Sequence, residues 1–290
     1  MKTGLIMEGG AMRGLYTAGV IDVMMENGIE FDGAIGVSAG AAFGCNYKSR
    51  QIGRVIRYNK RFAHEKRFCS LSSLIKTGDL YGADFCYRLL PDVLDPFDTY
   101  TYEHNPMAFY VVCTDMDTGE PIYHRCDSGN SEDITWMRAS ASMPIASKPV
   151  RIGGRRLLDG GISDSVPIRY FQRKGYGRNV IILTQPKGYR KKKLGILPLL
   201  RLRYPENRRM VDALARRHEV YNETLDYISE QEKKGTVFAV RPACPLNIGS
   251  TEHDTSEMER VYQEGRRVGT YNLAAMKRFL EKAKEGEAED

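Results

Sequence analysis

A serine between two glycines, placed after an apolar run, restricts the fold of this chain more than any other feature. The run begins at Gly33 and leads into Gly-x-Ser-x-Gly centred on Ser38, with small residues after it. This is the pattern of a nucleophile elbow, in which a strand ends, the backbone turns sharply and a helix begins. Small residues are needed there because the turn brings the strand and helix backbones together. We therefore predict that Ser38 is a nucleophile, in an elbow that also contains Gly36, Val37, Ala39 and Gly40.

A second cluster of small residues follows the first apolar run, residues 3–7. It comprises Gly9, Gly10, Ala11, Met12, Arg13 and Gly14. A glycine-rich loop between a strand and a helix can direct backbone N–H groups at a phosphate, or at the oxyanion of an acyl-transfer intermediate. A dinucleotide site would need an acidic residue at the end of the second strand, about 20 residues on, and the chain has Ser38 there. The sequence therefore favours an oxyanion hole, with a plain tight turn as the alternative.

An aspartate at the end of a predicted hairpin is the leading candidate for the base that activates Ser38. Residues 148–158 have the pattern of two short strands around a Gly-Gly turn, and they end in Asp159, followed by Gly160 and Gly161. An aspartate in this position can be held on a rigid scaffold facing a cleft. By itself it would be an ordinary turn residue. We predict that the three residues form a proton acceptor motif.

Apolar runs and helical periodicities alternate along the chain, which is typical of an α/β sandwich. We expect a three-layer α/β/α sandwich with a mostly parallel central sheet. Residues 1–185 are expected to form the catalytic core. Residues 186–290 would add a basic segment, a strand and helices that complete or cap the same domain. The strands are expected at 3–7, 33–37, 107–114, 179–184 and 236–240, and the longest helices at 207–234 and 254–282.

The cysteines and the hydropathy pattern limit which cofactors the protein can hold and where in the cell it can lie. The six cysteines show no Cys-x-x-Cys pair and no spacing to histidine that is typical of zinc sites. No apolar run approaches the roughly 18 residues that cross a bilayer, and residues 1–8 become polar too soon for a signal peptide. We expect reduced thiols, no metal and no other cofactor, in a cytoplasmic protein that contacts the inner membrane surface peripherally.

The segment from Lys187 to Arg217 is strongly basic. It holds eleven Lys and Arg residues against Glu206 and Asp212, a local charge of +9, and leucines are interleaved with these charges. A basic, leucine-rich stretch can lie on an anionic membrane, and a solvated loop is the alternative. Nucleic acid is not expected as a partner, because stacking groups are few and no binding motif is present. We predict a docking patch or lid that contacts the membrane through Arg190, Lys191, Lys192 and Lys193.

Three motifs in this order resemble the patatin-like phospholipases: the glycine-rich loop, the elbow around Ser38 and the motif that begins at Asp159. The resemblance covers residues 3–185, and residues 139–144 also look like the family's segment before its aspartate. It implies a lipid acyl hydrolase with a Ser38–Asp159 dyad, in which the amides of Gly9, Gly10 and Ala11, with Arg13 nearby, form the oxyanion hole. The family commonly has glycine where Ala11 stands. Alanine still donates its N–H unless the position needs a positive φ.

The resemblance implies a phospholipase A, lysophospholipase or carboxylesterase that acts on lipid or acyl-ester substrates in lipid catabolism. Two alternatives remain open. An acyltransferase would use the same acyl-serine, and a peripheral lipid-binding protein would keep an inert elbow. His218 and His253 follow Asp159 in the order that a triad hydrolase requires. His218 is expected on a helix surface, whereas His253 precedes a helix and stays a triad candidate.

Overall fold

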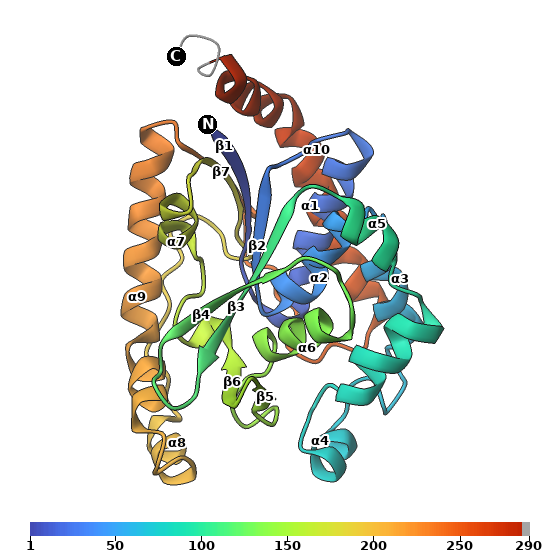
Figure 1. Cartoon of the computed structure of the whole chain (residues 1–290), viewed down its shortest axis with the longest axis vertical. Coiled ribbons are helices and arrows are strands. Elements are labelled where there is room, and N and C mark those ends of the chain that lie inside the picture. Colours follow the sequence, from blue (N-terminus) through green and yellow to red (C-terminus); the bar gives the residue numbers. More distant parts are fainter. Residues whose placement is uncertain (286–290) are drawn as a thin grey trace.

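The computed structural model describes residues 1–285, which form one eight-stranded sheet between two layers of helices (Figure 1). The strands are β1 (Lys2–Met7), β2 (Gly33–Val37), β3 (Ala108–Asp115), β4 (Pro121–Cys126), β5 (Val150–Ile152), β6 (Arg155–Asp159), β7 (Tyr176–Ile182) and β8 (Val237–Val240). The longer helices are α1 (Gly14–Glu26), α2 (Ala39–Lys48), α3 (Arg54–Arg61), α6 (Ser131–Ser140), α9 (Arg208–Lys233) and α10 (Thr255–Glu285). The remaining helical segments are η1 (Ala11–Arg13), α4 (Leu71–Thr77), η2 (Phe85–Leu94), α5 (Thr99–His104), η3 (Gly160–Ile162), α7 (Ile168–Arg173) and α8 (Leu197–Arg203).

The sheet is mixed. Strands β3, β2, β1, β7 and β8 pair in that order and run parallel, whereas β4 and β6 each pair antiparallel with β3, and β5 pairs antiparallel with β6. Short turns join β3 to β4 and β5 to β6, and a short turn can connect only antiparallel strands. The α/β class is thus confirmed, and the expected parallel arrangement holds for five of the eight strands, including β2, which leads into the elbow.

Helices cover both faces of the sheet (Figure 1). Helices α1, α2 and α10 lie on one face, and α7 and α9 lie on the other. Strands β1 and β2 are buried through almost their whole length, as their continuous apolar runs require. Parallel β1 and β2 both end at the same edge of the sheet, so the loops after Met7 and Val37 meet there.

Helices α1 and α10 pack with their backbones almost in contact. A Cβ atom on Gly19 of α1 would collide with the carbonyl of Tyr262, and one on Gly265 of α10 would collide with the carbonyl of Tyr16. The hydroxyl of Tyr262 donates to the buried Asp22 at 2.7 Å, which fixes the register of the two helices. The C-terminal helix therefore supports the helix that follows the glycine-rich loop.

The expected elements agree with the structure to within a few residues. The hairpin expected at 148–158 is confirmed as β5 and β6, and the helix expected at 207–234 is confirmed as α9. Beyond residue 185, β8 extends the same sheet by pairing with β7. Within residues 1–285, no helix is both long enough and apolar enough to cross a bilayer. The acidic tail expected to fray at 286–290 lies outside the described residues.

Candidate active site

Ser38 lies at the turn between β2 and α2, with φ 56° and ψ −121°. A residue other than glycine pays on the order of 1–3 kcal/mol for such a conformation, which persists only where its surroundings enforce it. A Cβ atom on Gly36 would collide with the carbonyl of Gly40, and one on Gly40 would collide with the carbonyl of Met7. The two glycines thus let the strand and the helix approach closely enough to hold the strained serine between them.

The backbone of Ser38 is also fixed by a serine from another helix. The Ser38 N–H donates to Ser140 Oγ at 3.0 Å, and Ser140 Oγ donates to the carbonyl of Val112 at 2.6 Å. Ser140 is the last residue of α6 and is fully buried. Sequence reasoning assigned it no role, because a serine at the end of an expected helix carries no signal of a contact made 102 residues away.

Asp159 ends β6 beside the Ser38 hydroxyl, and only 1 % of the residue is exposed. Its Oδ1 accepts from the Gly161 N–H at 2.7 Å, and its Oδ2 is buried with no hydrogen bond to any residue of the described chain. Burial raises the pKa of this carboxyl above its usual 3.8, and the Ser38 hydroxyl, the Arg217 guanidinium and the Gly161 amide oppose the rise. The result is a desolvated carboxylate with one free oxygen next to a hydroxyl.

The glycine-rich loop runs past the same serine. A Cβ atom on Gly9 would lie 2.8 Å from the Cβ of Ser38, so the loop backbone touches the elbow directly. Within residues 1–285, the N–H groups of Gly9, Gly10 and Ala11 donate no hydrogen bond. These three amides therefore remain available to an oxyanion.

The other three residues of the predicted loop contribute differently. The N–H of Arg13 donates to the carbonyl of Gly10 at 3.1 Å, and the N–H of Gly14 closes the first turn of η1, so both amides are occupied. Met12 turns its side chain into the core. The amides of Arg13 and Gly14 are therefore excluded from the candidate oxyanion hole, whereas the N–H of Met12 donates no hydrogen bond within residues 1–285 and stays a candidate beside those of Gly9, Gly10 and Ala11.

Ala11 has a φ of 50°, in the left-handed region that glycine occupies without strain. We expect Ala11→Gly to raise the free energy of unfolding in urea by about 1 kcal/mol, because the strain of a left-handed alanine is of that size. The control is Ala274→Gly on the exposed face of α10, which should lower that free energy by about 1 kcal/mol. A less stable Ala11→Gly protein would contradict the argument from strain.

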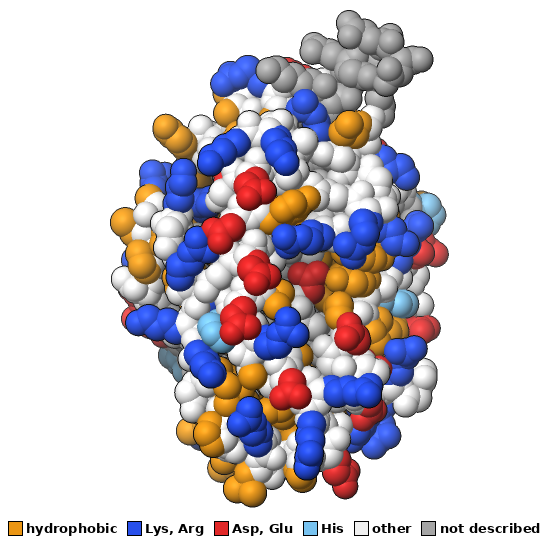
Figure 2. All heavy atoms as spheres, turned by 90° about the vertical axis from the view of Figure 1, so that its left-hand side faces the viewer, with side chains coloured by type: hydrophobic (Ala, Val, Ile, Leu, Met, Phe, Trp, Pro, Cys, Tyr) orange, Lys and Arg blue, Asp and Glu red, His pale blue; other side chains and the backbone are white. Residues whose placement is uncertain are grey.

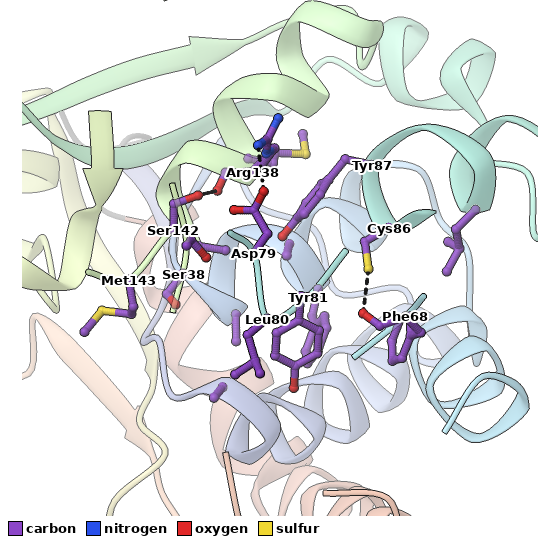
Figure 3. A pocket seen from close by; sticks show the side chains of 18 of the residues that line it. Ser38, Phe68, Asp79, Leu80, Tyr81, Cys86, Tyr87, Arg138, Ser142 and Met143 are labelled. Carbon is purple, nitrogen blue, oxygen red and sulfur yellow. Dashed lines mark hydrogen bonds and ion pairs between the residues drawn. The ribbon is translucent and has the colours of Figure 1, made fainter. Parts of the chain in front are cut away.

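An apolar cavity of about 400 Å³ lies beside Ser38 (Figure 3). In its wall, Arg138 pairs with the buried Asp79 at 3.4 Å, and the other oxygen of Asp79 accepts from the Lys148 N–H at 2.9 Å. Its walls come from α2, α3, η2 and α6 and from the segments that follow α4 and α6, and its apolar lining includes Phe43, Tyr58, Leu80, Tyr81, Leu90 and Met143. Sequence reasoning did not define this cavity, because no single segment carries it.

No histidine hydrogen-bonds to Ser38 or Asp159 in the part of the chain that the structure describes. Nδ1 of the exposed His253 lies 2.6 Å from the carbonyl oxygen of Ala63. His218 bonds to the carbonyl of Ala215 within its own helix, at 3.0 Å. Among the described residues, the side chain beside the Ser38 hydroxyl is therefore the Asp159 carboxylate, and no imidazole is hydrogen-bonded to either.

One cluster elsewhere carries residues of the metal-ligating type. Ligand atoms of His124, Cys126 and Asp133 lie within 4.8 Å of one another. Asp133 Oδ2 already accepts three hydrogen bonds, from the N–H and hydroxyl of Ser128 and the N–H of Gly129. These bonds hold the turn between β4 and α6, and we assign the cluster that structural role.

The four basic residues of the predicted docking patch are not equivalent. Arg190 pairs with Asp226 at 2.5 Å and donates to the carbonyl of Asn222. Lys191 is half-buried, with its ammonium 4.3 Å from the ring centroid of Tyr221. Lys192 and Lys193 are exposed, as is Arg190. The patch is thus divided between the surface and the interior.

Comparison with known proteins shows which family this chain belongs to. Residues 5–171 match the family described as Patatin-like phospholipase. The chain belongs to the patatin-like phospholipase family. A second match, over residues 207–281, is to a domain of unknown function, DUF6363. In this patatin-like protein the second match spans α9 and most of α10, so it covers elements that pack on the same sheet as the elbow.

Several relatives carry informative names. The uncharacterized protein YjjU of Escherichia coli K12 is 28 % identical, over 96 % of this chain and 79 % of YjjU. Lysophospholipase nte1 of Aspergillus oryzae is also 28 % identical, but the match spans 65 % of this chain and only 12 % of nte1. The uncharacterized NTE family protein MT2641 of Mycobacterium tuberculosis is 28 % identical over 67 % of this chain and 32 % of its own length. Among solved structures, VipD of Legionella pneumophila superposes with a TM-score of 0.46 and 11 % identity, covering 93 % of this chain and 67 % of VipD.

Proposed function

We propose that this protein is a serine lipid acyl hydrolase of the phospholipase A, lysophospholipase or carboxylesterase type, acting in lipid catabolism. The observation that supports this most strongly is the buried Asp159 carboxylate beside the Ser38 hydroxyl, with the amides of Gly9, Gly10 and Ala11 adjacent. The patatin-like family and its lysophospholipase relative favour the same class of substrate.

The reaction begins with proton transfer. Asp159 takes the proton of Ser38 Oγ as that oxygen attacks the carbonyl carbon of an acyl ester. The negative charge that develops on the carbonyl oxygen is held by the loop amides. Collapse of the tetrahedral intermediate breaks the ester C–O bond, and the proton on Asp159 passes to the leaving alcohol. An acyl-serine remains.

The second half returns the enzyme to its starting state. Asp159, again ionised, takes a proton from a water molecule, whose oxygen attacks the acyl carbon of the acyl-serine. The fatty acid leaves and the proton returns to Ser38 Oγ. Burial suits Asp159 to this work, since a carboxylate with a raised pKa is a stronger base than an exposed one. The apolar cavity beside Ser38 supplies the surface on which an acyl chain packs.

A fluorophosphonate probe tests the assignment of Ser38. Peptide mapping of the labelled wild-type protein should place the phosphonyl group on Ser38, because an activated serine attacks the probe and an ordinary serine does not. Release of free fatty acid from a lysophospholipid should accompany labelling, and acyl transfer to added glycerol would instead indicate the acyltransferase. An unlabelled Ser38 in the folded protein would leave only the lipid-binding alternative.

We further propose that one end of the molecule docks on an anionic membrane. Figure 1 places α4 and α8 at the same end, and Figure 2 shows hydrophobic side chains gathered there among Lys and Arg. On α8, Leu202 is 80 % exposed, and on α4, Ile75 is 84 % exposed. Other exposed apolar and basic residues on these helices or just before α8 include Leu71, Lys76, Lys192, Lys193, Ile196, Leu199, Arg201 and Arg203. Apolar side chains flanked by cations favour the surface of an anionic bilayer.

Replacing Leu199 and Leu202 together by serine should weaken binding to phosphatidylglycerol-containing vesicles at least ~10-fold, because each leucine withdrawn from the interface costs more than 1 kcal/mol. Sedimentation with vesicles measures this. Tyr271→Ser is the control, since Tyr271 is 84 % exposed but lies on α10, outside the two helices of the proposed docking surface. Vesicle binding that is unchanged in the double variant would remove α8 from the docking surface.

A further inference from the structure

A cation from the C-terminal part of the chain reaches the candidate catalytic carboxylate. Arg217 lies on the inner face of α9, one turn before the buried Tyr221. Its Nη2 lies 3.2 Å from the point where a Cβ on Gly161 would stand, and Asp159 Oδ1 lies 3.0 Å from the same point. The guanidinium and the carboxylate are therefore no further apart than the sum of these two distances, although they form no direct ion pair.

A second cation, Lys191, lies beside the first. Its ammonium sits over the ring of Tyr221, and its backbone is fixed to α9 because its N–H donates to Asn222 at 2.8 Å and its carbonyl accepts from the same side chain at 3.1 Å. Lys191 interacts electrostatically with Arg217 and with Arg13 of the glycine-rich loop. Burial, reinforced by these two cations, lowers its pKa to about 8, while Glu8 acts in the opposite direction.

The carboxylate that interacts with Lys191 belongs to Glu8, and it already accepts hydrogen bonds from other groups. Glu8 accepts from the N–H of Thr184 at 2.6 Å, from its hydroxyl at 3.1 Å and from the hydroxyl of Tyr221 at 2.6 Å. Glu8 is buried, and all three donors are neutral. Within residues 1–285, its hydrogen bonds therefore come from neutral groups and not from the cations beside it.

The donors of the two guanidiniums are, by contrast, free. The Nε atoms of Arg13 and Arg217 are both buried, and neither arginine forms a side-chain hydrogen bond or salt bridge within residues 1–285. Three cations thus lie near two carboxylates, Glu8 and Asp159. Because burial raises the pKa of Asp159, its negative charge is disfavoured, and the local balance of charge is positive. Buried guanidinium donors without partners are costly. An incoming anion would satisfy them and would balance the charge.

We infer that Lys191 and Arg217, with Arg13 at its edge, form a subsite for a phosphate group carried by the alcohol part of the acyl ester. This inference rests on the proposed hydrolase function. Guanidiniums are suited to phosphate because their planar forks donate two hydrogen bonds at once. None of the three cations lines the apolar cavity. The phosphate of one substrate would therefore lie outside the cavity that receives its acyl chain.

Residues outside the patatin-like match supply this subsite. Lys191 and Arg217 both follow residue 171, and Arg217 lies within the region that matches a domain of unknown function. The subsite therefore gives that region a role in choosing the substrate. It also predicts that a neutral acyl ester is a poorer substrate than a phosphorylated one of equal chain length.

Steady-state kinetics on two esters test the subsite. An octanoyl glycerol phosphate and the matching octanoyl glycerol, both used as monomers, differ only in the phosphate. The wild-type KM should be at least ~10-fold lower for the phosphorylated ester, since a charged hydrogen bond contributes more than 1.4 kcal/mol. Arg217→Gln and Lys191→Gln should each remove most of this preference. Arg216→Gln, an exposed neighbour on the same helix, should retain it.

Direct binding separates failure of the subsite from failure of the hydrolase. Ser38→Ala protein should bind inorganic sulfate in calorimetry, with affinity that falls as the pH rises through about 8, where Lys191 loses its proton. Adding Arg217→Gln should reduce this binding at least ~10-fold, and adding Arg216→Gln should not. Equal KM values for the two esters in wild type, or a preference retained in Arg217→Gln, would overturn the inference while the hydrolase stands.

The remaining outcomes are also decisive. Sulfate binding without an ester preference would assign the cations to free inorganic anions and would overturn the role in substrate choice. If neither ester is hydrolysed, the proposed function fails, and sulfate binding alone decides whether the anion site exists. Absence of sulfate binding in Ser38→Ala protein would then overturn the site as well.

Discussion

Ser38→Ala should lower kcat/KM for a p-nitrophenyl acyl ester by at least ~10⁴-fold, because the covalent route disappears with the hydroxyl. Ser38→Gly should lose activity equally but should raise the free energy of unfolding by about 1 kcal/mol, since glycine tolerates the φ of 56° that strains serine. Steady-state kinetics and urea denaturation measure the two effects. The pair of variants thus separates the chemical role of the side chain from its conformational cost.

The control for Ser38 is Ser131→Ala, at an exposed position at the start of α6. This variant should keep wild-type turnover and stability. Turnover near the wild-type rate in a folded Ser38→Ala protein would refute the nucleophile assignment, whatever the stability of the glycine variant.

Asp159→Asn should reduce kcat by about 10³-fold, within the range for loss of a general base. The amide keeps the shape of the side chain and can still accept from Gly161, but it cannot take the proton of Ser38. Asp164→Asn is a matched control, because Asp164 also has a pKa raised by burial and accepts from Tyr123 instead of serving Ser38. Near-normal kcat in Asp159→Asn would show that another group acts as the base.

The same variant has a pH-dependent effect on stability. The folded state raises the pKa of Asp159, so the folded protein binds this proton more tightly than the unfolded chain. The free energy of unfolding of the wild type therefore falls as the pH rises from about 3.8 through the raised pKa. It stays at the lower value above that pKa. Asp159→Asn should be more stable than wild type at pH 7, by on the order of 1 kcal/mol, and the difference should vanish below pH 4. Chemical denaturation at both pH values measures it.

Local patterns predicted the parts of the site that depend on neighbouring residues. The elbow is encoded by five consecutive residues, and the hairpin that ends in Asp159 is encoded by two short strands around Gly153 and Gly154. The α/β class and the positions of the main strands along the chain followed from the alternation of apolar runs and helical periodicities. The elbow and the hairpin are each determined within about ten residues of chain.

Contacts between distant segments could not be predicted in this way. Ser140 reaches Ser38 across 102 residues, and the apolar cavity takes its walls from helices and loops spread from Ala11 to Thr251. Within the basic segment, the charge pattern alone does not distinguish Lys191, which turns inward onto Tyr221, from the exposed Lys192. The sequence cannot tell whether the position of Ala11 needs a positive φ, and only the fold shows that this backbone adopts one.

The packing of α10 on α1 has a consequence for the order in which the molecule matures. A ribosome makes the chain from its N-terminus, so the glycine-rich loop, Ser38 and Asp159 emerge long before the helix whose Gly265 presses against Tyr16. The nascent chain therefore carries Ser38 and Asp159 while α1 still lacks its backing. That support forms only after α10 has been translated, so the proposed site gains its full backing later than the segments that carry its residues.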